Sequence, residues 1–350
     1  MKTIYLVTGA NGHLGSAVCA ALHEKAADVR ALVLPGENTD FLQSLGVQIV
    51  RGNVCNPSEL DAFFDVGERR RIVIHCAGIV NITENAAKQM EAVNIGGTKN
   101  ILEMCKKYKT ERLIYVSSVH AIPVPAKGRV IREVTDFSPD LVEGAYAKTK
   151  AAATALVLES ARAGVPAIVV HPSGIVGPYL GRGNHLVQMI QSYITGKLPA
   201  IVKGGYDFVD VRDCAAGILS AVEFGKVGEC YILSGDFYEI REVVDMLREI
   251  VAGKRPGTVP LWMARLAAPI LERQALRHGK KPLFTSYSLS TLTVNSRFSH
   301  DKAAKELGYT PRELFVTLRD TVEWLVKREG CKIARGAGRR AKLRPSLSEG

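Results

Sequence analysis

The chain has 350 residues, of which 47% are hydrophobic, and this is enough to bury one large core or one core with a smaller appended domain. It contains no run of about 18 uncharged apolar residues and no apolar stretch near its start that follows basic residues, so we expect neither secretion nor a membrane-spanning segment. The net charge of +11 includes +5 from residues 331–350, which we predict to be a basic disordered tail, and this distribution argues against a nucleic-acid partner.

The seven cysteines are scattered, mostly within apolar runs. No two of them have the CxxC spacing of a redox or zinc motif. Cysteines of this kind are typical of reduced proteins, so the sequence predicts a cytoplasmic protein, and we expect no metal site.

The chain begins with an apolar strand, a glycine-rich turn and a helix. The strand is predicted at 4–7, the turn TGANGHLG occupies 8–15, and a helical pattern follows. Glycines at three offsets allow a tight turn, a close approach of the backbone to a pyrophosphate, and close packing of the helix on the strand. The first N–H groups of the helix can bind the phosphates. The predicted dinucleotide contacts here are Gly9, Asn11, Gly12, His13, Leu14 and Gly15.

Further apolar strands alternate with helical patterns along the chain. Strands are predicted at 29–34, 47–50, 71–75, 113–116 and 167–170, and helices at 58–64, 86–107 and 146–163. This alternation indicates a parallel sheet covered by helices on both faces. Because crossovers are right-handed, the expected fold is a doubly wound α/β (Rossmann) sheet.

The regular alternation fades after His171, where turn residues become frequent. We therefore predict a dinucleotide-binding domain over 1–171 and a smaller domain, mainly for substrate, over 172–330. The strand-like run at 230–233 predicts that about 205–235 returns to the main sheet, so that the second domain is interrupted.

Two polar features point to chemistry. Tyr146 and Lys150 are four residues apart in a predicted helix and therefore share a face. A phenol has a pKa of about 10, and a nearby ammonium favours the phenolate and lowers that pKa. Ser117 and Ser118 follow the strand at 113–116, at the sheet edge where ligands of such folds gather. A surface Tyr/Lys pair and a serine turn without function are the alternative reading.

In order and spacing, these motifs resemble the extended short-chain dehydrogenases/reductases, the epimerase/dehydratase-like superfamily, over nearly the whole chain. The matching elements are TGANGHLG at 8–15, GNV at 52–54, HCAG at 75–78, NIGGTKN at 94–100, YAKTK at 146–150, HPSGIVGP at 171–178, VDVRD at 209–213 and GYTPR at 308–312. The resemblance implies a catalytic triad of Ser118, Tyr146 and Lys150, with Ser118 preferred because the second serine of the pair is usually the catalytic one. Tyr146 would exchange a proton with the substrate oxygen, Ser118 would hydrogen-bond that oxygen, and Lys150 would hold the nicotinamide ribose.

The resemblance also implies an NAD(P) cofactor along the carboxyl edge of the sheet. Besides the glycine turn, Tyr146 and Lys150, the implied contacts are Leu34, Asn53, Val54, Cys76, Ala77, Gly78, Asn94, Val116, Pro172 and Ser173. An acid at the end of the second strand would bind a ribose 2′-hydroxyl, but Val33 and Leu34 supply none, which favours NADP weakly. Two charged residues are near this end: Arg30 lies within the strand and could face either way, and Glu37 could reach back from the turn.

The element HPSGIVGP looks like the RPSGIYGP of dihydroflavonol-reductase-like and 3β-hydroxysteroid-dehydrogenase-like members, with His171 in place of arginine. We therefore predict an oxidoreductase that reduces a ketone or oxidises a secondary alcohol on a partly apolar small molecule. One alternative is a nucleotide-sugar epimerase that retains NAD. The other is a cofactor-sensing binding module without turnover, against which the intact triad argues.

Two surfaces suggest contacts beyond the active site. The helices at 86–107 and 146–163 correspond to those through which relatives commonly form homodimers, and the second is rich in alanine, so we predict a homodimer, with a monomer as the alternative. The segment 261–276 has an apolar stripe followed by basic residues up to 281. It can be a helix of the second domain, a wall over the substrate pocket, or a weak membrane-surface contact without stable insertion.

Overall fold

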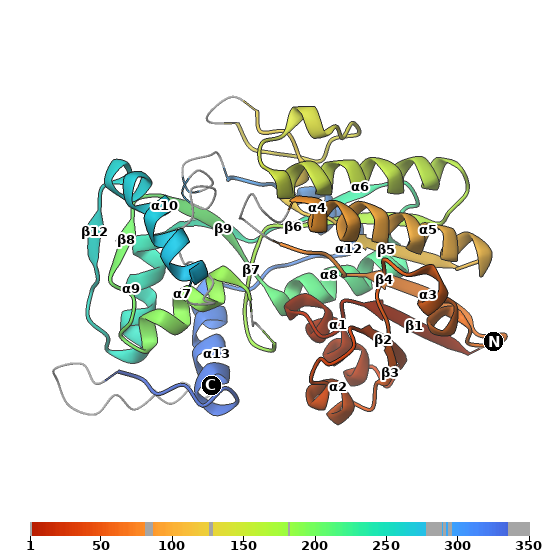
Figure 1. The fold of residues 1–350 in the computed structure, drawn as a ribbon, viewed down its shortest axis with the longest axis horizontal. Coiled ribbons are helices and arrows are strands. Elements are labelled where there is room, and N and C mark those ends of the chain that lie inside the picture. The colour runs from red at the N-terminus through yellow and green to blue at the C-terminus, as the bar shows by residue number, and fades with distance from the viewer. Residues whose placement is uncertain are drawn as a thin grey trace.

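A seven-stranded parallel sheet with the order β10-β6-β5-β4-β1-β2-β3 forms the core of the part of the molecule drawn on the right in Figure 1. The computed structural model describes residues 2–80, 87–125, 129–180, 183–277, 289, 292 and 296–334. The strands of this sheet are β1 (Thr3–Thr8), β2 (Asp28–Val33), β3 (Gln48–Arg51), β4 (Arg70–His75), β5 (Arg112–Val116), β6 (Ala167–Pro172) and β10 (Cys230–Leu233). The predicted doubly wound fold is confirmed, with strand ends that differ from the predicted ones by one or two residues.

Helices cover both faces of this sheet. One face carries α1 (His13–Glu24), α2 (Asp40–Ser44), α8 (Val211–Phe224) and α12 (Asp301–Leu307), and the other carries α3 (Pro57–Phe64), α5 (Thr98–Lys107) and α6 (Ala145–Arg162). The helix predicted at 86–107 is a continuous run of α4 (Ala87–Met90), a π-helical turn η2 (Glu91–Gly97) and α5, with residue 86 outside the described residues. The wide turn at η2 faces the carboxyl edge of the sheet and places Asn94 there.

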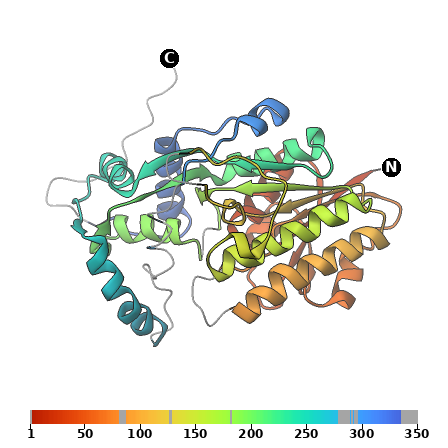
Figure 2. The ribbon, with the colours of Figure 1, turned by 90° about the horizontal axis from the view of Figure 1, so that it is seen from above.

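A second group of elements lies beyond one end of the sheet and has its own core (Figures 1 and 2). It contains a three-stranded sheet of β7 (Gly174–Val176), β9 (Gly205–Asp210) and β11 (Asp236–Glu239), and a pair of β8 (Ala200–Val202) and β12 (Gly257–Val259). Its helices are α7 (His185–Ile194), α9 (Ile240–Val251), α10 (Leu261–Arg277) and α13 (Leu314–Lys327). Two short 3₁₀ turns, η3 (Val119–Ala121) and η4 (Pro139–Leu141), precede α6.

The chain passes between the two groups more than once. β6 belongs to the main sheet and β7, which begins two residues after it, to the three-stranded sheet. Within the stretch 205–235, β9 stays in the three-stranded sheet, whereas α8 packs on the main sheet and β10 forms its edge beside β6. The crossings bring residues 173–178 and 207–213 next to the carboxyl edge of the main sheet.

The alanines of α6 mostly face the sheet. Ala151 and Ala153 are fully buried within this chain's own core, whereas Lys148 and Glu159 are exposed and Ala155 is half-buried. The expectation that small alanines around most of this helix provide a docking face is therefore wrong for Ala151 and Ala153, since their size serves the close packing of α6 on β5 and β6.

The start of the predicted tail contacts the second group. The N–H of Ala334 donates to the Ile194 carbonyl at 2.8 Å, and Gln191 Nε2 lies 3.2 Å from Cys331 Sγ. Residues 335–350 lie outside the described residues. Within the described part of the chain, no helix combines the length and apolar character needed to cross a bilayer.

Candidate active site

The glycine turn between β1 and α1 uses its three glycines for different purposes. Gly9 has a φ of +63°, and a Cβ there would lie 2.7 Å from the Ala77 backbone. A Cβ at Gly15 would collide with the Gly9 carbonyl oxygen. Gly12 has a φ of −82°, which suits any residue, and the nearest atom to a Cβ there is the Gly9 oxygen at 3.2 Å. The absence of a side chain at Gly12 therefore leaves the outer side of the turn open, beside an α1 N-terminus that no side chain caps and whose N–H groups can bind an anion.

Not every residue of this turn that was predicted to contact a cofactor has a side chain free to do so. The His13 ring is half-buried and hydrogen-bonded within the protein and the Leu14 side chain is buried, so both residues can serve a cofactor through their backbone N–H groups. Asn11 Oδ1 is buried and has no hydrogen-bond partner in the described structure, while its Nδ2 lies 3.4 Å from Glu37 Oε2. An unpartnered buried amide oxygen in this turn fits a site that a ligand completes.

A chain of buried hydrogen bonds lies next to the glycine turn, at the ends of β1 and β4. The Ala77 N–H donates to Thr8 Oγ1 at 3.2 Å, and Thr8 Oγ1 lies 2.6 Å from His75 Nδ1. His75 Nε2 lies 3.1 Å from Thr98 Oγ1, whose hydroxyl donates to the Asn94 carbonyl at 2.7 Å. Burial lowers the pKa of His75 to about 3, so its neutral ring accepts from Thr8 and donates to Thr98. This chain fixes the ends of β1 and β4 against η2.

Asn94 holds the segment that follows β4. Its Oδ1 accepts from the Ile79 N–H at 2.8 Å and its Nδ2 donates to the Ile79 carbonyl at 3.0 Å and to Thr149 Oγ1 at 3.0 Å. Asn94 therefore positions the predicted cofactor segment Cys76–Gly78 and is itself tied to α6. The sequence pattern suggested a cofactor contact for Asn94 and did not reveal this bracing role.

The structure separates the two serines at the end of β5. Ser117 Oγ lies 2.7 Å from Thr154 Oγ1, which donates to the Lys150 carbonyl, so Ser117 is fixed against α6. Ser118 Oγ instead lies near enough to the Tyr146 hydroxyl to oppose the rise of its pKa, and it accepts from the His120 N–H at 3.2 Å. Ser118 is therefore the serine that shares a site with Tyr146.

The protonation of Tyr146 differs from the expectation drawn from its spacing to Lys150. Burial raises the pKa of Tyr146 to about 12, and the nearby Ser118 hydroxyl is what opposes this shift. Burial lowers the pKa of Lys150 to about 8, and its Nζ donates to the Val116 carbonyl at 2.8 Å and lies 5.1 Å from the centre of the Tyr115 ring. The expected lowering of the Tyr146 pKa is therefore not found, since burial dominates.

The ammonium of Lys150 borders the space beside Gly78. A Cβ at Gly78 would lie 3.3 Å from Lys150 Nζ and 3.2 Å from Asn94 Oδ1. The absence of a side chain at Gly78 thus leaves space beside a cation, an amide and the open end of the sheet. These residues fit the hydroxyl groups of a ribose, which accept from ammonium and donate to carbonyl oxygens.

His171 lies under Ser118 and was noted in the sequence only as a departure from the usual arginine. Its Nδ1 donates to the Ser118 carbonyl at 2.9 Å, and its ring stacks on Phe137 with an interplanar angle of 5° and centroids 5.2 Å apart. Burial lowers the pKa of His171 to about 4, and Nε2 has no hydrogen-bond partner among the described residues. The contact spans 53 positions in sequence, so no local pattern announces it.

Ser173 is engaged by the second group of elements. Its hydroxyl donates to Asp207 Oδ1 at 2.5 Å, and Asp207 also accepts from the Gly235 N–H at 2.9 Å. Burial raises the pKa of Asp207 to about 7 despite these bonds. The Ser173 hydroxyl is thus oriented away from the predicted cofactor contact, and Pro172 ends β6 directly before it.

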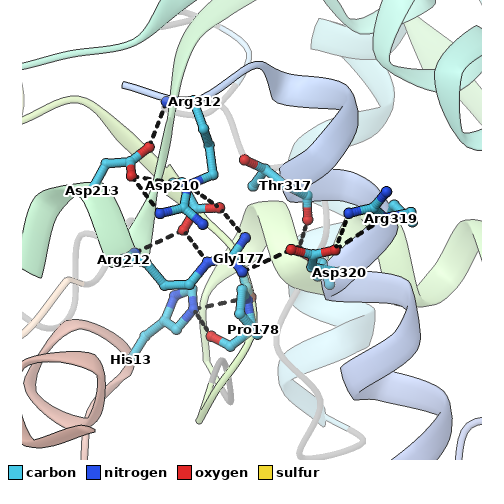
Figure 3. Close-up of polar contacts among 11 residues, drawn as sticks. His13, Gly177, Pro178, Asp210, Arg212, Asp213, Arg312, Thr317, Arg319 and Asp320 are labelled. Atoms are coloured by element: carbon cyan, nitrogen blue, oxygen red, sulfur yellow. Dashed lines mark hydrogen bonds and ion pairs between the residues drawn. The ribbon is translucent and has the colours of Figure 1, made fainter. Parts of the chain in front are cut away.

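Two polar connections join the glycine turn and α8 to the second group (Figure 3). Asn184 caps α7 with its Oδ1, so its Nδ2 faces His13 Nδ1 at 3.0 Å. His13 Nε2 must then carry the proton, and it lies 3.2 and 2.9 Å from the carbonyl oxygens of Gly177 and Pro178. Burial lowers the pKa of His13, consistent with this neutral form.

The sequence elements VDVRD and GYTPR meet in the other connection (Figure 3). Arg212 forms an ion pair with Asp210 at 2.7 Å and with Asp320 of α13 at 2.7 Å. Arg312 binds Asp213 at 2.7 Å, and its backbone N–H donates to the same carboxylate at 2.8 Å. The ion pairs lower the pKa of Asp210 although burial opposes this shift. These motifs therefore hold α8 and α13 together.

At the expected adenosine end, Leu34 is 47% exposed and no acid replaces it. Arg30 points elsewhere, since it donates to the Asp65 carbonyl at 2.8 Å. Arg51, at the end of β3, donates to the carbonyls of Leu34 at 3.2 Å and Glu37 at 2.7 Å. No local sequence pattern announces this position of Arg51, because it follows from the pairing of β3 with β2.

Asn53 and Val54 form the turn after β3. Asn53 Oδ1 accepts from the Cys55 N–H at 2.9 Å, and its own N–H donates to Glu59 Oε2 at 2.6 Å. Val54 is buried, and Asn100 donates to its carbonyl at 2.9 Å. Within the described residues, no group of three or more His, Cys, Asp or Glu side chains could hold a metal ion.

The structure thus brings most predicted site residues to one edge of the sheet. The glycine turn, Cys76–Gly78, Asn94, Val116, Ser118, Tyr146 and Lys150 are linked by the contacts above. The side chains of His13, Leu14, Val54 and Ser173 are occupied within the protein.

Comparison with known proteins gives three findings. The family model "NAD dependent epimerase/dehydratase family" matches residues 5–234. A Synechocystis sp. protein whose name assigns it as a dihydroflavonol 4-reductase is 29% identical, over 93% of this chain and 95% of its own length, and the sterol demethylase protein B of Methylococcus capsulatus is 28% identical, over 92% and 98%. The crystal structure of gox2253 is 31% identical and has a TM-score of 0.81, over 95% of this chain and 100% of its own.

Proposed function

The chain belongs to the NAD dependent epimerase/dehydratase family and is an oxidoreductase of the extended short-chain dehydrogenase/reductase type, and we propose that it reduces a ketone on a partly apolar small molecule, or oxidises the corresponding secondary alcohol. The bound NAD(P) supplies or accepts the hydride. The observation that carries the proposal is the contact of Ser118 with the Tyr146 hydroxyl beside the buried ammonium of Lys150.

Each member of the triad has one task in this proposal. The Tyr146 hydroxyl holds the proton that the ketone oxygen receives, and Ser118 Oγ donates to the same oxygen and stabilises its developing charge. Lys150 Nζ would hold the ribose hydroxyls of the cofactor in the space beside Gly78. His171 keeps the Ser118 backbone in place through its bond to the Ser118 carbonyl.

The relatives' names support an apolar substrate. They refer to a dihydroflavonol and a sterol. We propose the same broad class for this chain, with residues 1–171 binding the cofactor and 172–330 mainly selecting the substrate. The change of sheet between β6 and β7 supports that division.

The test is the reduction of a panel of cyclic and aryl ketones, measured as the oxidation of NADH or NADPH. Tyr146→Phe should lower turnover by about 10²- to 10⁴-fold and leave cofactor affinity nearly unchanged, because it removes only the proton-transfer hydroxyl. Tyr108→Phe, at the end of α5, is the matched control and should retain the parent rate. More than half the parent rate in Tyr146→Phe would remove Tyr146 from the mechanism. Tightly bound NAD in the purified protein, with turnover of nucleotide sugars, would favour the epimerase alternative.

The preference for NADP rests on Arg51. Its guanidinium is held at the end of β2 by two backbone carbonyls, and a guanidinium there suits a 2′-phosphate, whereas Glu37 is the acid that would favour a ribose hydroxyl. We expect Arg51→Gln to raise the Kd for NADPH at least tenfold and to change the Kd for NADH little. Glu37→Gln should not weaken the binding of NADPH. Weaker binding of both cofactors to Arg51→Gln by the same factor would mean that Arg51 only holds the turn.

We propose a cytoplasmic homodimer. All seven cysteines are free, as in a reducing compartment. α5 and α6 lie side by side on one flank, and the part of α6 left available includes the half-buried Ala155 and Leu156. Ala155→Glu should shift the protein toward monomer in sedimentation, because a two-fold axis duplicates the new charge. A monomeric parent protein at high concentration would overturn this assignment.

A further inference from the structure

Helix α10 presents an apolar face to solvent. Trp262 is 64% exposed, Leu266 69% and Ile270 69%, and their spacing of four residues places them on one side of the helix. Met263, 46% exposed, extends this side. Folded proteins rarely expose neighbouring large apolar side chains without a partner.

The opposite side of α10 anchors the helix. Ala268 is fully buried, and Leu261 and Ala264 pack against the core of the second group of elements. The exposed side therefore faces away from that core, at the end of the molecule remote from the seven-stranded sheet (Figures 1 and 2). This geometry favours an external contact over a wall facing the inside of a pocket.

The net charge of the chain lies in two stretches of the sequence, one of which contains α10. Residues 252–281 contain seven Lys or Arg and one Glu, and residues 331–350 contain six and one, so the net +11 of the whole chain lies in these two stretches. Arg265, within α10, is exposed, and so is Lys254, which precedes the helix in sequence. An apolar helix face bordered by cations complements an anionic surface.

We propose that the apolar face of α10, formed by Trp262, Met263, Leu266 and Ile270, docks on the surface of a membrane that contains anionic lipids. The helix lies in the plane of the interface, since no described helix can cross a bilayer. Two copies of this chain facing each other through α10 would bring like charges together, which disfavours self-association by this face. Such docking would place the second group of elements, which we propose selects the substrate, near a source of apolar molecules.

The experiment uses the full-length protein and vesicles. The chain has two tryptophans, so a Trp324→Phe background leaves Trp262 as the reporter. We expect Trp262 emission to shift to the blue with vesicles of phosphatidylglycerol and phosphatidylcholine, and the protein to sediment with them, with at least tenfold weaker binding to pure phosphatidylcholine. Raising the salt from 50 to 500 mM should weaken binding, because the charges are screened.

Variants separate this proposal from its competitors. Leu266→Glu and Ile270→Glu should each weaken vesicle binding at least tenfold, with unchanged circular dichroism. Phe224→Glu, at an equally exposed phenylalanine (61%) at the end of α8, should not. Equal loss in Phe224→Glu, or no binding of the parent to anionic vesicles, would overturn the proposal. If the parent self-associates and Ile270→Glu abolishes this, the face binds a second copy of the chain and the proposal is overturned. If the parent does not bind vesicles and Ile270→Glu raises the KM, the face belongs to the substrate pocket and the proposal is also overturned.

Discussion

Replacing Lys150 by methionine should stabilise the protein without cofactor while it removes turnover. Burial lowers the pKa of Lys150 from 10.5 to about 8. Each pKa unit corresponds to about 1.4 kcal/mol, so the buried ammonium costs about 3 kcal/mol of folding free energy at pH 7. Loss of its bond to the Val116 carbonyl opposes the gain by about 1–2 kcal/mol. We expect a net stabilisation of about 1–2 kcal/mol.

The pH dependence identifies the cause. Between about pH 8 and 10.5 the folded state binds fewer protons at Lys150 than the unfolded state does, so the parent gains stability as the pH rises through this window. The cost falls from about 3 kcal/mol at pH 7 to about 1 kcal/mol at pH 10, and the advantage of Lys150→Met should shrink by the same amount.

The assay is urea unfolding followed by circular dichroism at pH 7, 9 and 10. Other titrating groups are common to both proteins, so the difference between parent and variant isolates Lys150. Lys148→Met, at an exposed lysine of the same helix, is the control and should differ little from the parent at every pH. A difference between the parent and Lys150→Met that stays constant from pH 7 to 10 would refute the reasoning.

Three further outcomes follow from the structure. Gly12→Ala should fold and lose cofactor affinity, whereas Gly15→Ala should lose thermal stability, because its Cβ meets backbone atoms; normal cofactor affinity in Gly12→Ala by calorimetry would mean that the turn serves folding alone. Truncation after Ala334 should leave the melting temperature unchanged, and truncation after Gly330 should lower it by a few degrees, since it removes the contacts with α7; equal melting curves would show that these contacts are negligible. The free energy of unfolding should fall as the pH drops from about 6.5 to 4, because buried His171 has a pKa of about 4 when folded, and His171→Phe should reduce this slope; an identical slope would place the proton uptake elsewhere.

The parts of the fold that the sequence predicted are those encoded locally. Apolar runs and the glycine turn predicted the main sheet, because a buried parallel strand needs a continuous apolar run and the turn needs glycine at Gly9 and Gly15. The resemblance to a family predicted which residues gather at its edge.

The remainder depends on contacts between distant segments. The protonation of Tyr146 follows from the amount of protein that covers it, which spacing to Lys150 does not reveal. The burial of Ala153 within this chain could not be predicted, because an alanine-rich helix has no sharp apolar stripe that shows which side faces the core. The positions of Arg51 and His171 follow from strand pairing and from a contact across 53 residues.

In the mechanism that we propose, the protonation state of Tyr146 sets the direction that the site favours. With a pKa of about 12, the phenol is protonated at neutral pH and ready to donate, whereas the phenolate that alcohol oxidation requires is populated at only about 10⁻⁵ at pH 7. The rate of oxidation should therefore rise about tenfold per pH unit above pH 7, while reduction stays level until Lys150 loses its proton near pH 8. Initial rates in both directions from pH 6 to 9.5, on one ketone and its alcohol, measure this. Oxidation that levels off above about pH 7, with reduction falling over the same range, would show that bound cofactor lowers the Tyr146 pKa into the neutral range, because the phenolate would then replace the phenol within the range measured.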